Sequence, residues 1–455
     1  MIRSEENIAR NLDWIAVGFY ILFVFLGWLN IYAVVYDPEA ASTIFDFSIN
    51  SGKQLMWIGG SALIVITVMV IDFKFYSTFA YFFYGASIFL LILTIALGTV
   101  VNGSHSWLDL GFVRVQPAEF AKFATALALA KYLGDIHIRI ERVGSWIIPA
   151  AGMIILPCII ILLQNETGSM LVFSAFVLVL FREGLPGTLL LLGVYITTLF
   201  VLTLGIGTET PVNEIEVGSW THRLGIQAEA PVMIGVVVLF ILIFIYIFLN
   251  RTRISRKQFM KQIIMIVISC VLSLGFIKVV HKIFFDVLQE HQRNRIMVLF
   301  DTELDTRGVG YHVHQSKIAI GSGDFFGKGF LEGTQTKFDF VPEQSTDFIF
   351  CTIGEEHGWF GSTILIILYV GFMMRLVFIA ERQKDRFARI YGYSVTCIIF
   401  FHFMVNIGMT IGIFPVIGIP LPFFSYGGSS LWSFTLLLFV FLKLDAHRGQ
   451  VLGGH

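Results

Sequence analysis

Long apolar stretches separated by short polar segments recur along almost the whole chain of 455 residues. Stretches of about 17 to 25 apolar residues are long enough to cross the hydrocarbon layer of a membrane as helices. The pattern predicts about twelve spans, near residues 13–34, 54–71, 77–100, 117–133, 145–163, 167–181, 186–206, 230–250, 262–280, 346–374, 390–413 and 427–443. We therefore expect an all-α polytopic membrane protein.

The charges of the connecting segments predict an orientation, because Lys and Arg accumulate in short cytoplasmic loops. With the N-terminus inside, the basic loops all fall on the cytoplasmic side; they carry Lys74, Lys131, Arg139, Arg142, Arg182, Arg251, Arg253, Arg256, Lys257, Lys261, Arg375, Arg382, Lys384, Arg386, Arg389, Lys443 and Arg448. The long segment 281–346 also contains Lys and Arg, but loops beyond about 60 residues follow this rule poorly. We expect it outside, with both termini cytoplasmic.

The composition agrees with a membrane environment and argues against nucleic acid as a binding partner. Hydrophobic residues make up 56% of the chain and charged residues only 14%, where soluble proteins have about a quarter charged. A net charge of -1 gives no general attraction to nucleic acid. The four cysteines are widely spaced in or beside apolar runs, and predict neither a zinc site nor a disulfide framework. The first apolar run is too long for a cleavable signal peptide, so we expect it to be a membrane span and residues 1–455 to form a single integral membrane domain.

One long polar, glycine-rich segment, residues 305–361, interrupts this apolar pattern. Just before and at its start, acidic residues alternate as oxygen ligands of a hard cation do, although the spacing lacks the glycine and distal glutamate of an EF-hand: Asp301, Glu303 and Asp305. The glycines that follow permit close backbone packing, and three lysines supply charge suited to phosphate: Lys317, Lys328 and Lys337. A solvated acidic cluster and a site for an anionic, lipid-linked substrate both fit this pattern.

A second polar feature, Gln116-Pro117-Ala118-Glu119-Phe120-Ala121-Lys122, opens the fourth span. Proline suits a first helical turn, and Glu119 suits the positive end of a helix, so a helix cap is one interpretation. Lys122 follows at i+3, one turn deeper, where a charge is costly unless it is paired or faces a polar cavity. The Glu119/Lys122 pair is therefore also a candidate functional site.

Three further segments carry polar residues beside the spans. Residues 164–169 place Glu166 at the outer interface, where a turn and helix cap is the favoured interpretation. Four carboxylates surround the start of the tenth span, and indicate either a proton or ion pathway or solvated groups: Glu343, Asp347, Glu355 and Glu356. Residues 415–430 contain three prolines and a Gly-Gly pair, which cannot continue a helix, and predict either a surface loop or the wall of a cavity.

Together these segments resemble the SEDS family, the shape, elongation, division and sporulation proteins that polymerise peptidoglycan glycan strands. The matching motifs run in order through residues 103–122, 164–173, 305–361 and 406–430. The loop sequence Gly-Tyr-His-Val-His-Gln-Ser-Lys, starting at Gly310, resembles the RodA elongation branch more than the FtsW division branch. The family has a ten-helix core, so the resemblance implies that residues 230–280 are an inserted transmembrane hairpin and that 281–346 are the large extracytoplasmic catalytic loop.

The resemblance implies a peptidoglycan glycosyltransferase that polymerises lipid II at the outer face of the bacterial cytoplasmic membrane during cell-wall elongation. Asp305 corresponds to the family's essential loop carboxylate, as general base toward the attacking sugar hydroxyl or as ligand of a divalent cation, Mg²⁺ or Mn²⁺. Glu119, Lys122 and Glu166 would shape the cavity. The substrate-binding candidates are Gln315, Ser316, Lys317, Lys328, Glu343, Asp347 and Ser425.

Two positions depart from the family pattern. Ser106 precedes Trp107 where the family has arginine, so a phosphate-binding role would pass to Arg114 or another residue. Glu166 stands where the family has aspartate, which is one carbon shorter.

The implied partners are a class B penicillin-binding protein, which cross-links the strands, and other membrane proteins of the elongation complex. Two alternative functions stay open. A lipid II flippase would also use charges inside the membrane, but it needs them to face both sides. A non-catalytic cell-wall scaffold would not need Asp305.

Overall fold

The computed structural model describes residues 11–36, 43–101, 104–109, 111, 113–135, 146–207, 230–249, 255–287, 309–337, 341 and 343–449. The chain divides into two compact units. The first comprises Met1–Pro186 and His312–His455, and the second comprises Gly187–Tyr311. The expectation of a single domain stays a prediction, and each unit is described by itself.

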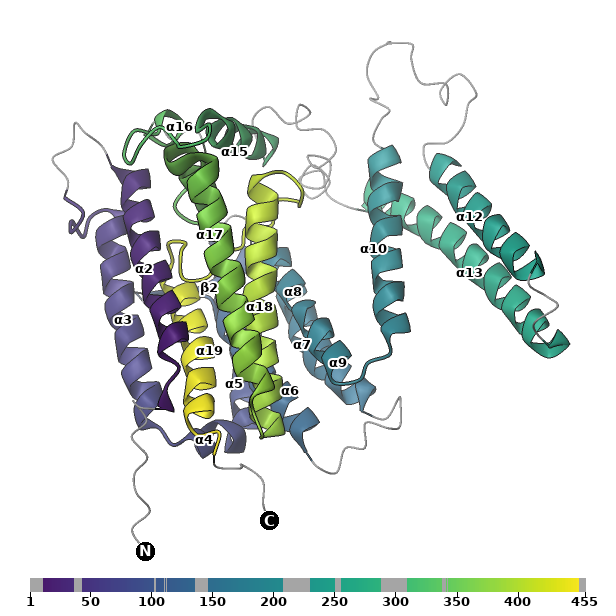
Figure 1. Cartoon of the computed structure of the whole chain (residues 1–455), viewed down its shortest axis with the longest axis horizontal. Coiled ribbons are helices and arrows are strands. Elements are labelled where there is room, and N and C mark those ends of the chain that lie inside the picture. Colours follow the sequence, from purple (N-terminus) through teal and green to yellow (C-terminus); the bar gives the residue numbers. More distant parts are fainter. Residues whose placement is uncertain are drawn as a thin grey trace, which may run out of the picture. The chain divides into compact units, whose positions relative to one another are not determined.

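Most helices of the first unit follow the predicted spans, whereas those at 73–78, 309–322 and 334–337 lie mainly in segments predicted as loops (Figure 1). The helices of this unit are α2 (Trp14–Val35), α3 (Asn50–Val70), α4 (Phe73–Thr78), α5 (Ala80–Leu97), α6 (Pro117–Gly134), α7 (Ile147–Leu163), α8 (Thr167–Val172), α9 (Ala175–Arg182), α16 (Thr334–Lys337), α17 (Ile349–Glu381), α18 (Arg386–Thr410) and α19 (Gly428–Ala446), together with most of α15 (Val309–Ser322). This confirms the expected all-α membrane fold.

Nine helices among the described residues of the two units are long and apolar enough to cross a membrane. Three other predicted spans are helical but differ in length or charge. α7 is shorter, α8 and α9 are separate short helices, and α6 contains Glu119, Lys122 and Lys131.

The core of the first unit is built on a small-residue helix and on aromatic rings. α6 carries alanine at 118, 121, 124, 126, 128 and 130, and packs between α5 and α18. Small residues let neighbouring helices approach closely, which is how helices pack without a hydrophobic drive in lipid. Phe23 of α2 stacks on Tyr369 of α17 with ring centroids 4.2 Å apart. Tyr20 meets Phe439 of α19 edge-on at 5.0 Å.

The ends of α2, α17 and α19 meet at one end of this unit. Asp13 accepts a hydrogen bond from the backbone nitrogen of Ala16 at 3.1 Å and so caps α2. The same carboxylate pairs with Arg375 at 2.7 Å and Arg382 at 3.0 Å. Arg382 also pairs with Asp445 near the end of α19. The start of the first span and the end of the last therefore lie at the same end of the bundle (Figure 1).

A small antiparallel sheet, which the sequence pattern did not predict, connects α5 to α6. Its strands β1 (Thr99–Val101), β2 (Ser104–Asp109) and β3 (Arg114–Val115) pair in that order. In the register, Thr99 lies opposite Trp107 and Leu108 lies opposite Val115. The sheet orients the polar side chains of β2.

α17 runs for 33 residues from Ile349 to Glu381 and so extends beyond the predicted span of 346–374. At about 1.5 Å per residue, that is about 50 Å, more than a hydrocarbon layer needs. The helix is kinked at Gly358, whose φ of 65° and ψ of −162° are open to glycine and strained for other residues. The turns before the kink bind residues 323–337, which follow α15 and are here named the polar connection.

The second unit consists of α10 (Gly187–Gly207), α12 (Ala230–Leu249) and α13 (Arg256–Lys282), which continues as the π-helical turn η2 (Ile283–Val287). Val232 and Val236 near the start of α12 pack with Ile277 near the end of α13, so these two helices form an antiparallel hairpin. α13 begins with a reciprocal capping box between Ser255 and Gln258. That this hairpin is an insertion into a ten-helix core stays a prediction.

Candidate functional site

Lys122 lies fully buried in the first unit and connects α6 to α18. Its Nζ atom donates a hydrogen bond to Oε1 of Glu119 at 2.8 Å and lies 2.8 Å from Nε2 of His402. The second carboxylate oxygen of Glu119 is buried and has no hydrogen-bond partner in the described part of the chain. The predicted Glu119/Lys122 pair is therefore a buried ion pair and not a solvated helix cap.

His402 was not among the sequence-predicted site residues. It is 0% exposed, and its Nδ1 atom lies 3.1 Å from the backbone oxygen of Pro420. A single histidine in an apolar helix is ordinarily interpreted as a core residue. The one sequence signal was that His402 lies one helical turn before Asn406, the residue that starts the fourth matching motif.

The beginning of α6 is also tied to the beginning of α19. The Oγ atom of Ser429 accepts from the backbone nitrogen of Gln116 at 3.2 Å and donates to the backbone oxygen of Arg114 at 3.0 Å. Ser433 donates to the backbone oxygen of Glu119 at 2.8 Å. Two motifs more than 300 residues apart in the chain thus form one structure. The guanidinium of Arg114 pairs with Asp109 at 3.2 Å in an exposed position.

Glu166 occupies the N-cap position just before α8, but its side chain makes no capping hydrogen bond to that helix's backbone. Its carboxylate instead accepts from Ser104 at 2.9 Å and from Ser169 at 3.4 Å. The Ser104 hydroxyl, which has one proton, also lies 3.0 Å from the backbone oxygen of Gln164 and 2.8 Å from the hydroxyl of Ser106. The serine at 106, where the family has arginine, therefore joins the same buried network as Glu166.

Asp347, just before α17, belongs to the same region. Burial, and then the charges of Glu343 and Glu166, raise the pKa of its carboxyl to about 7. Its Oδ2 atom lies so close to Gly418 that a Cβ atom there would be 3.3 Å away. Glu343 is exposed, and its side chain accepts from the hydroxyl of Thr346 at 3.1 Å.

Residues 415–427, here named the proline segment, are buried in the bundle at 419 and 421–425, and their first four residues are partly exposed or exposed. Leu421, Phe424 and Ser425 are at most 3% exposed, so the second half of this segment is packed into the protein. The hydroxyl of Ser425 accepts from the backbone nitrogen of Leu421 at 2.9 Å, which closes a turn. The backbone oxygen of Pro422 accepts from Tyr369 at 2.6 Å.

Glu355 holds the polar connection between α15 and α17. Its buried carboxylate accepts from the Nζ atom of Lys328 at 2.7 Å and from the backbone nitrogens of Gln335 at 2.8 Å and Thr336 at 3.0 Å. Thr334 also approaches at 3.3 Å. These contacts occupy the carboxylate, so in this structure Glu355 anchors residues 323–337 where the sequence had suggested an ion pathway or a solvated group.

Glu356 and several glycines complete this anchor. Glu356 accepts from the backbone nitrogen of Leu331 at 3.1 Å through its side chain, and from Gly329 at 3.0 Å through its own backbone oxygen. Gly327 has a φ of 84°, and a Cβ atom on it would lie 2.1 Å from the same oxygen. A Cβ atom on Gly323 would lie 2.0 Å from the backbone oxygen of Gly354. The glycines allow the close backbone packing that the sequence predicted.

Three neighbouring candidates lie on α15. Ser316 is buried and donates to the backbone oxygen of Thr410 at 2.9 Å, which joins α15 to the end of α18. Lys317 is exposed, and its side chain crosses Gly412, where a Cβ atom would be 2.6 Å from Nζ. Gln315 is partly exposed. Of these three, Ser316 has a clear structural role.

Asp305, the predicted catalytic residue, lies outside the described residues, as do Asp301 and Glu303. Among the residues that the structure does describe, no group of three or more His, Cys, Asp or Glu side chains could hold a metal ion.

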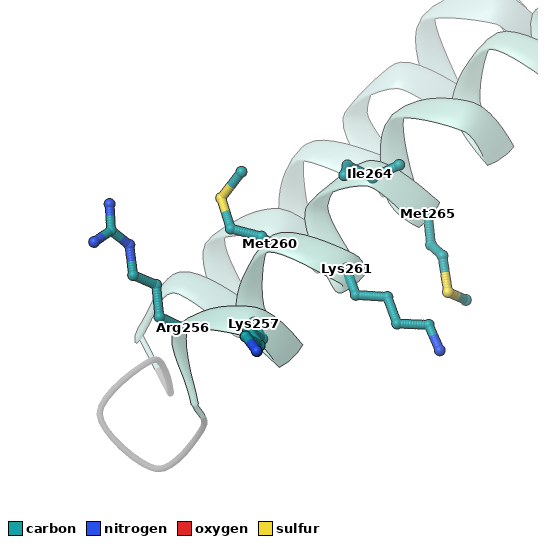
Figure 2. Close-up of a pocket in the computed structure, with 6 residues that line it drawn as sticks. All are labelled: Arg256, Lys257, Met260, Lys261, Ile264 and Met265. Atoms are coloured by element: carbon teal, nitrogen blue, oxygen red, sulfur yellow. The ribbon is translucent and has the colours of Figure 1, made fainter.

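Two hollows lie apart from these polar groups. One of about 490 Å³ in the first unit lies between α2, α17 and residues 326–330, and its lining is mainly apolar, with Asn30 at its wall. The other lies along the first turns of α13 and is lined by Arg256, Lys257, Met260, Lys261, Ile264 and Met265. Figure 2 shows these six side chains on one helix, and among the described residues the lining comes from α13 alone. Neither hollow gathers the candidate residues.

Comparisons with known proteins agree with the order of the motifs. Residues 13–222 and 224–450 match the family model described as Cell cycle protein, FtsW/RodA/SpoVE. Over 399 residues the chain is 32% identical to the peptidoglycan glycosyltransferase MrdB of Escherichia coli K12, covering 87% of this chain and 85% of that protein.

Two solved structures have a similar fold. One is a chain from work on the structural coordination of polymerization and crosslinking by a peptidoglycan synthase complex; it has a TM-score of 0.64, 24% identity, and coverage of 96% of this chain and 99% of that chain. The other is the rod shape determining protein RodA of Thermus thermophilus, with a TM-score of 0.58, 23% identity, and coverage of 96% and 98%. With the two family matches spanning nearly all of its residues, this chain belongs to the FtsW/RodA/SpoVE family, and the RodA-like resemblance is confirmed.

Proposed function

We propose that this protein is a peptidoglycan glycosyltransferase that polymerises lipid II into glycan strands at the outer face of the bacterial cytoplasmic membrane during cell-wall elongation. The observation that carries the proposal is the buried Glu119–Lys122 pair, which lies with Glu166 and Asp347 around the proline segment in a chain of this family. Charged groups inside a membrane bundle are costly, and they mark sites or pathways for polar substrates.

In this reaction a sugar hydroxyl attacks the anomeric carbon of a lipid-linked donor. The bond between that carbon and the diphosphate breaks, and undecaprenyl diphosphate leaves with the bonding electrons. The hydroxyl proton passes to a base, for which we propose Asp305 by its correspondence to the family's loop carboxylate. Lys122, fully buried in the bundle, supplies a fixed positive charge to the site.

The proposed substrate contacts are the candidates whose side chains stay at least partly exposed. They are Gln315, Lys317, Lys328, Glu343 and Asp347. Lys328 is shared with Glu355, so it would contact substrate only from the side that the carboxylate leaves open. Ser316 and Ser425 are occupied by backbone contacts and act on the site through the fold.

A divalent cation, Mg²⁺ or Mn²⁺, belongs to the proposal only through Asp305. The described residues do not by themselves offer a ligand set, so we derive no step through a cation. Its test is removal by a chelator, followed by addition of either metal.

We further propose a class B penicillin-binding protein as the cross-linking partner, with other membrane proteins of the elongation complex. The similar chain that comes from a peptidoglycan synthase complex supports this. Both termini are proposed to be cytoplasmic. The contacts of Arg382 with Asp13 and Asp445, at the end where the basic loops are expected, support this orientation.

The test is polymerisation of lipid II by the purified protein, with and without a cognate transpeptidase. Wild type is compared with Asp305→Ala and with Glu332→Ala, which removes an exposed carboxylate from the polar connection. We expect glycan strands from wild type and Glu332→Ala, and none from a folded Asp305→Ala. Absence of strands from all three, with an active partner present, would refute the proposal. Transfer of lipid II across vesicles by the same preparation would then favour the flippase.

A further inference from the structure

His402 is a buried titratable side chain that the proposed chemistry does not use. α18 places it between α6 and the proline segment, with one ring nitrogen at Lys122 and the other at Pro420. Its ring also meets Phe434 of α19 edge-on, with centroids 4.8 Å apart. One imidazole therefore contacts the buried ion pair, the irregular segment and the last span.

The partners of the ring determine which nitrogen carries the proton. A backbone carbonyl oxygen can only accept, so Nδ1 must be protonated to bond to Pro420 at 3.1 Å. In a neutral imidazole the other nitrogen is then an acceptor. Nε2 therefore accepts from the Nζ atom of Lys122 at 2.8 Å. A doubly protonated ring would point its Nε2–H at the lysine ammonium, and no solvent reaches this site to screen the two positive charges. The ring is therefore neutral.

This arrangement gives Lys122 two acceptors from two different helices. A lysine side chain has several rotatable bonds, and holding it in one orientation costs conformational entropy. Glu119 supplies one acceptor from the same helix, three residues away. His402 supplies the second from α18, and its position depends in turn on the proline segment through Pro420.

We propose that His402 is a positioning residue: as the neutral Nδ1-protonated tautomer, it orients the ammonium group of Lys122 and connects its position to the proline segment. The predicted tautomer is independent of what the protein does. The expected effect on activity rests on the proposed function.

The tautomer is tested by ¹⁵N NMR of histidine-labelled protein in lipid bilayers, with the His402 signals assigned by their loss in His402→Gln. We expect one protonated and one unprotonated ring nitrogen, with the proton on Nδ1. A proton on Nε2, or on both nitrogens, would overturn the proposal. This measurement remains valid if the protein forms no glycan strands.

The positioning role is tested by polymerisation kinetics. His402→Phe keeps a ring but removes both hydrogen bonds, whereas His402→Gln can still offer one acceptor and one donor. Loss of a hydrogen bond to a charged group corresponds to about a ten- to hundredfold lower kcat/KM, and we expect that loss in His402→Phe, with partial rescue in His402→Gln. The control is His447→Phe, because His447 caps the end of α19, where it bonds to the backbone oxygen of Lys443 and stacks on Phe73.

A double-mutant cycle separates positioning from a general structural defect. If His402 acts through Lys122, His402→Phe will add little to the loss caused by Lys122→Met. Full additivity of the two losses, or wild-type activity in His402→Phe, would overturn the positioning role. Melting temperatures of all variants check folding, and if His402→Phe does not fold, the tautomer of wild type and the activity of His402→Gln carry the test.

Discussion

The side-chain nitrogen of Asn406 donates a hydrogen bond to the backbone oxygen of Asp347 at 2.8 Å. The same nitrogen donates to the backbone oxygen of Ile419, also at 2.8 Å. Asn406 on α18 therefore joins the residue that precedes α17 to the proline segment that follows α18. This contact holds the carboxyl of Asp347 in the polar region where Glu166 and Glu343 act on it.

Replacing Asp347 by Asn should change the pH dependence of stability. The pKa of Asp347 is raised from 3.8 to about 7, so the folded state binds more protons than the unfolded state between these values. The stability that the protonated carboxyl contributes is complete below the unfolded pKa and is lost as the pH rises through about 7. Asn resembles the protonated form. We expect Asp347→Asn to melt near wild type at about pH 4 and higher than wild type at about pH 8.

Melting temperatures across this pH range in detergent measure the effect. Asp324→Asn, at an exposed acidic position in the polar connection, is the control. A difference between Asp347→Asn and wild type that stays constant with pH would contradict the prediction.

Replacing Asp13 by Asn should act in the opposite sense. Burial raises the pKa of Asp13, but hydrogen bonds from Arg375 and the backbone of Ala16, with the charges of Arg375 and Arg382, bring it below its ordinary value of 3.8. The ionised carboxylate therefore stabilises the fold above that value, and this contribution is lost as the pH falls through the lower folded pKa. We expect Asp13→Asn to lose about 2 to 3 kcal/mol of stability near neutral pH.

Thermal or denaturant unfolding at neutral and acidic pH tests this expectation, and the difference from wild type should narrow under acid. The matched control is Asp109→Asn, because Asp109 pairs with Arg114 in an exposed position, where ion pairs contribute little. Equal losses of stability in the two variants would show that the buried ion pair of Asp13 stabilises the fold no more than the exposed pair of Asp109.

Replacing Glu355 by Gln should loosen residues 323–337 without unfolding the bundle. The amide keeps one acceptor oxygen but loses the charge that pairs with Lys328 and one of the oxygens that hold Gln335 and Thr336. Hydrogen exchange followed by mass spectrometry should show faster exchange in this segment and little change in α18. Glu332→Gln, at an exposed position nearby, provides the comparison. Unchanged exchange in 323–337 would argue against the anchor.

Replacing Gly327 by Ala should destabilise the protein more than the same change at Gly321. Gly327 has a φ of 84°, and an added Cβ would lie 2.1 Å from the backbone oxygen of Glu356. The left-handed conformation alone costs about 1 to 2 kcal/mol for a residue with a Cβ atom. Gly321 lies in α15 with no atom within 4 Å of an added Cβ, and Ala favours a helix. Melting temperatures decide, and a similar stability for both variants would disprove the close approach.

Hydropathy alone was enough to predict the long apolar helices, because a backbone in lipid must satisfy its own hydrogen bonds, but it did not predict α4, α15 or α16. All twelve predicted spans correspond to helical segments among the described residues. Helix ends were less predictable. α13 begins at Arg256 rather than 262, because the capping box of Ser255 and Gln258 starts the helix among polar residues. The sheet of β1 to β3 was missed, because its strands are only two to six residues long.

The candidate site was predicted where its contacts are local. Glu119 and Lys122 are three residues apart, so helix geometry alone brings them together. The contact of Lys122 with His402 and that of Glu166 with Ser104 depend on how elements distant in the chain pack, and hydropathy does not predict this. The role of Glu355 was missed for the same reason, since its partners are backbone groups of a folded loop. Asp305 stays a prediction.

The proline segment packs its apolar side chains into the core, and its main chain accepts hydrogen bonds from three side chains of other elements. The backbone oxygens of Ile419, Pro420 and Pro422 accept from the side chains of Asn406, His402 and Tyr369. Proline lacks an N–H group, so this stretch offers unpaired carbonyl acceptors that a regular helix would have used internally. Evolutionary constraint should therefore fall on the three donor side chains and on the prolines that shape the backbone. The buried side chains of Ile419 and Leu421 between the prolines should be restricted in volume, because they fill the core.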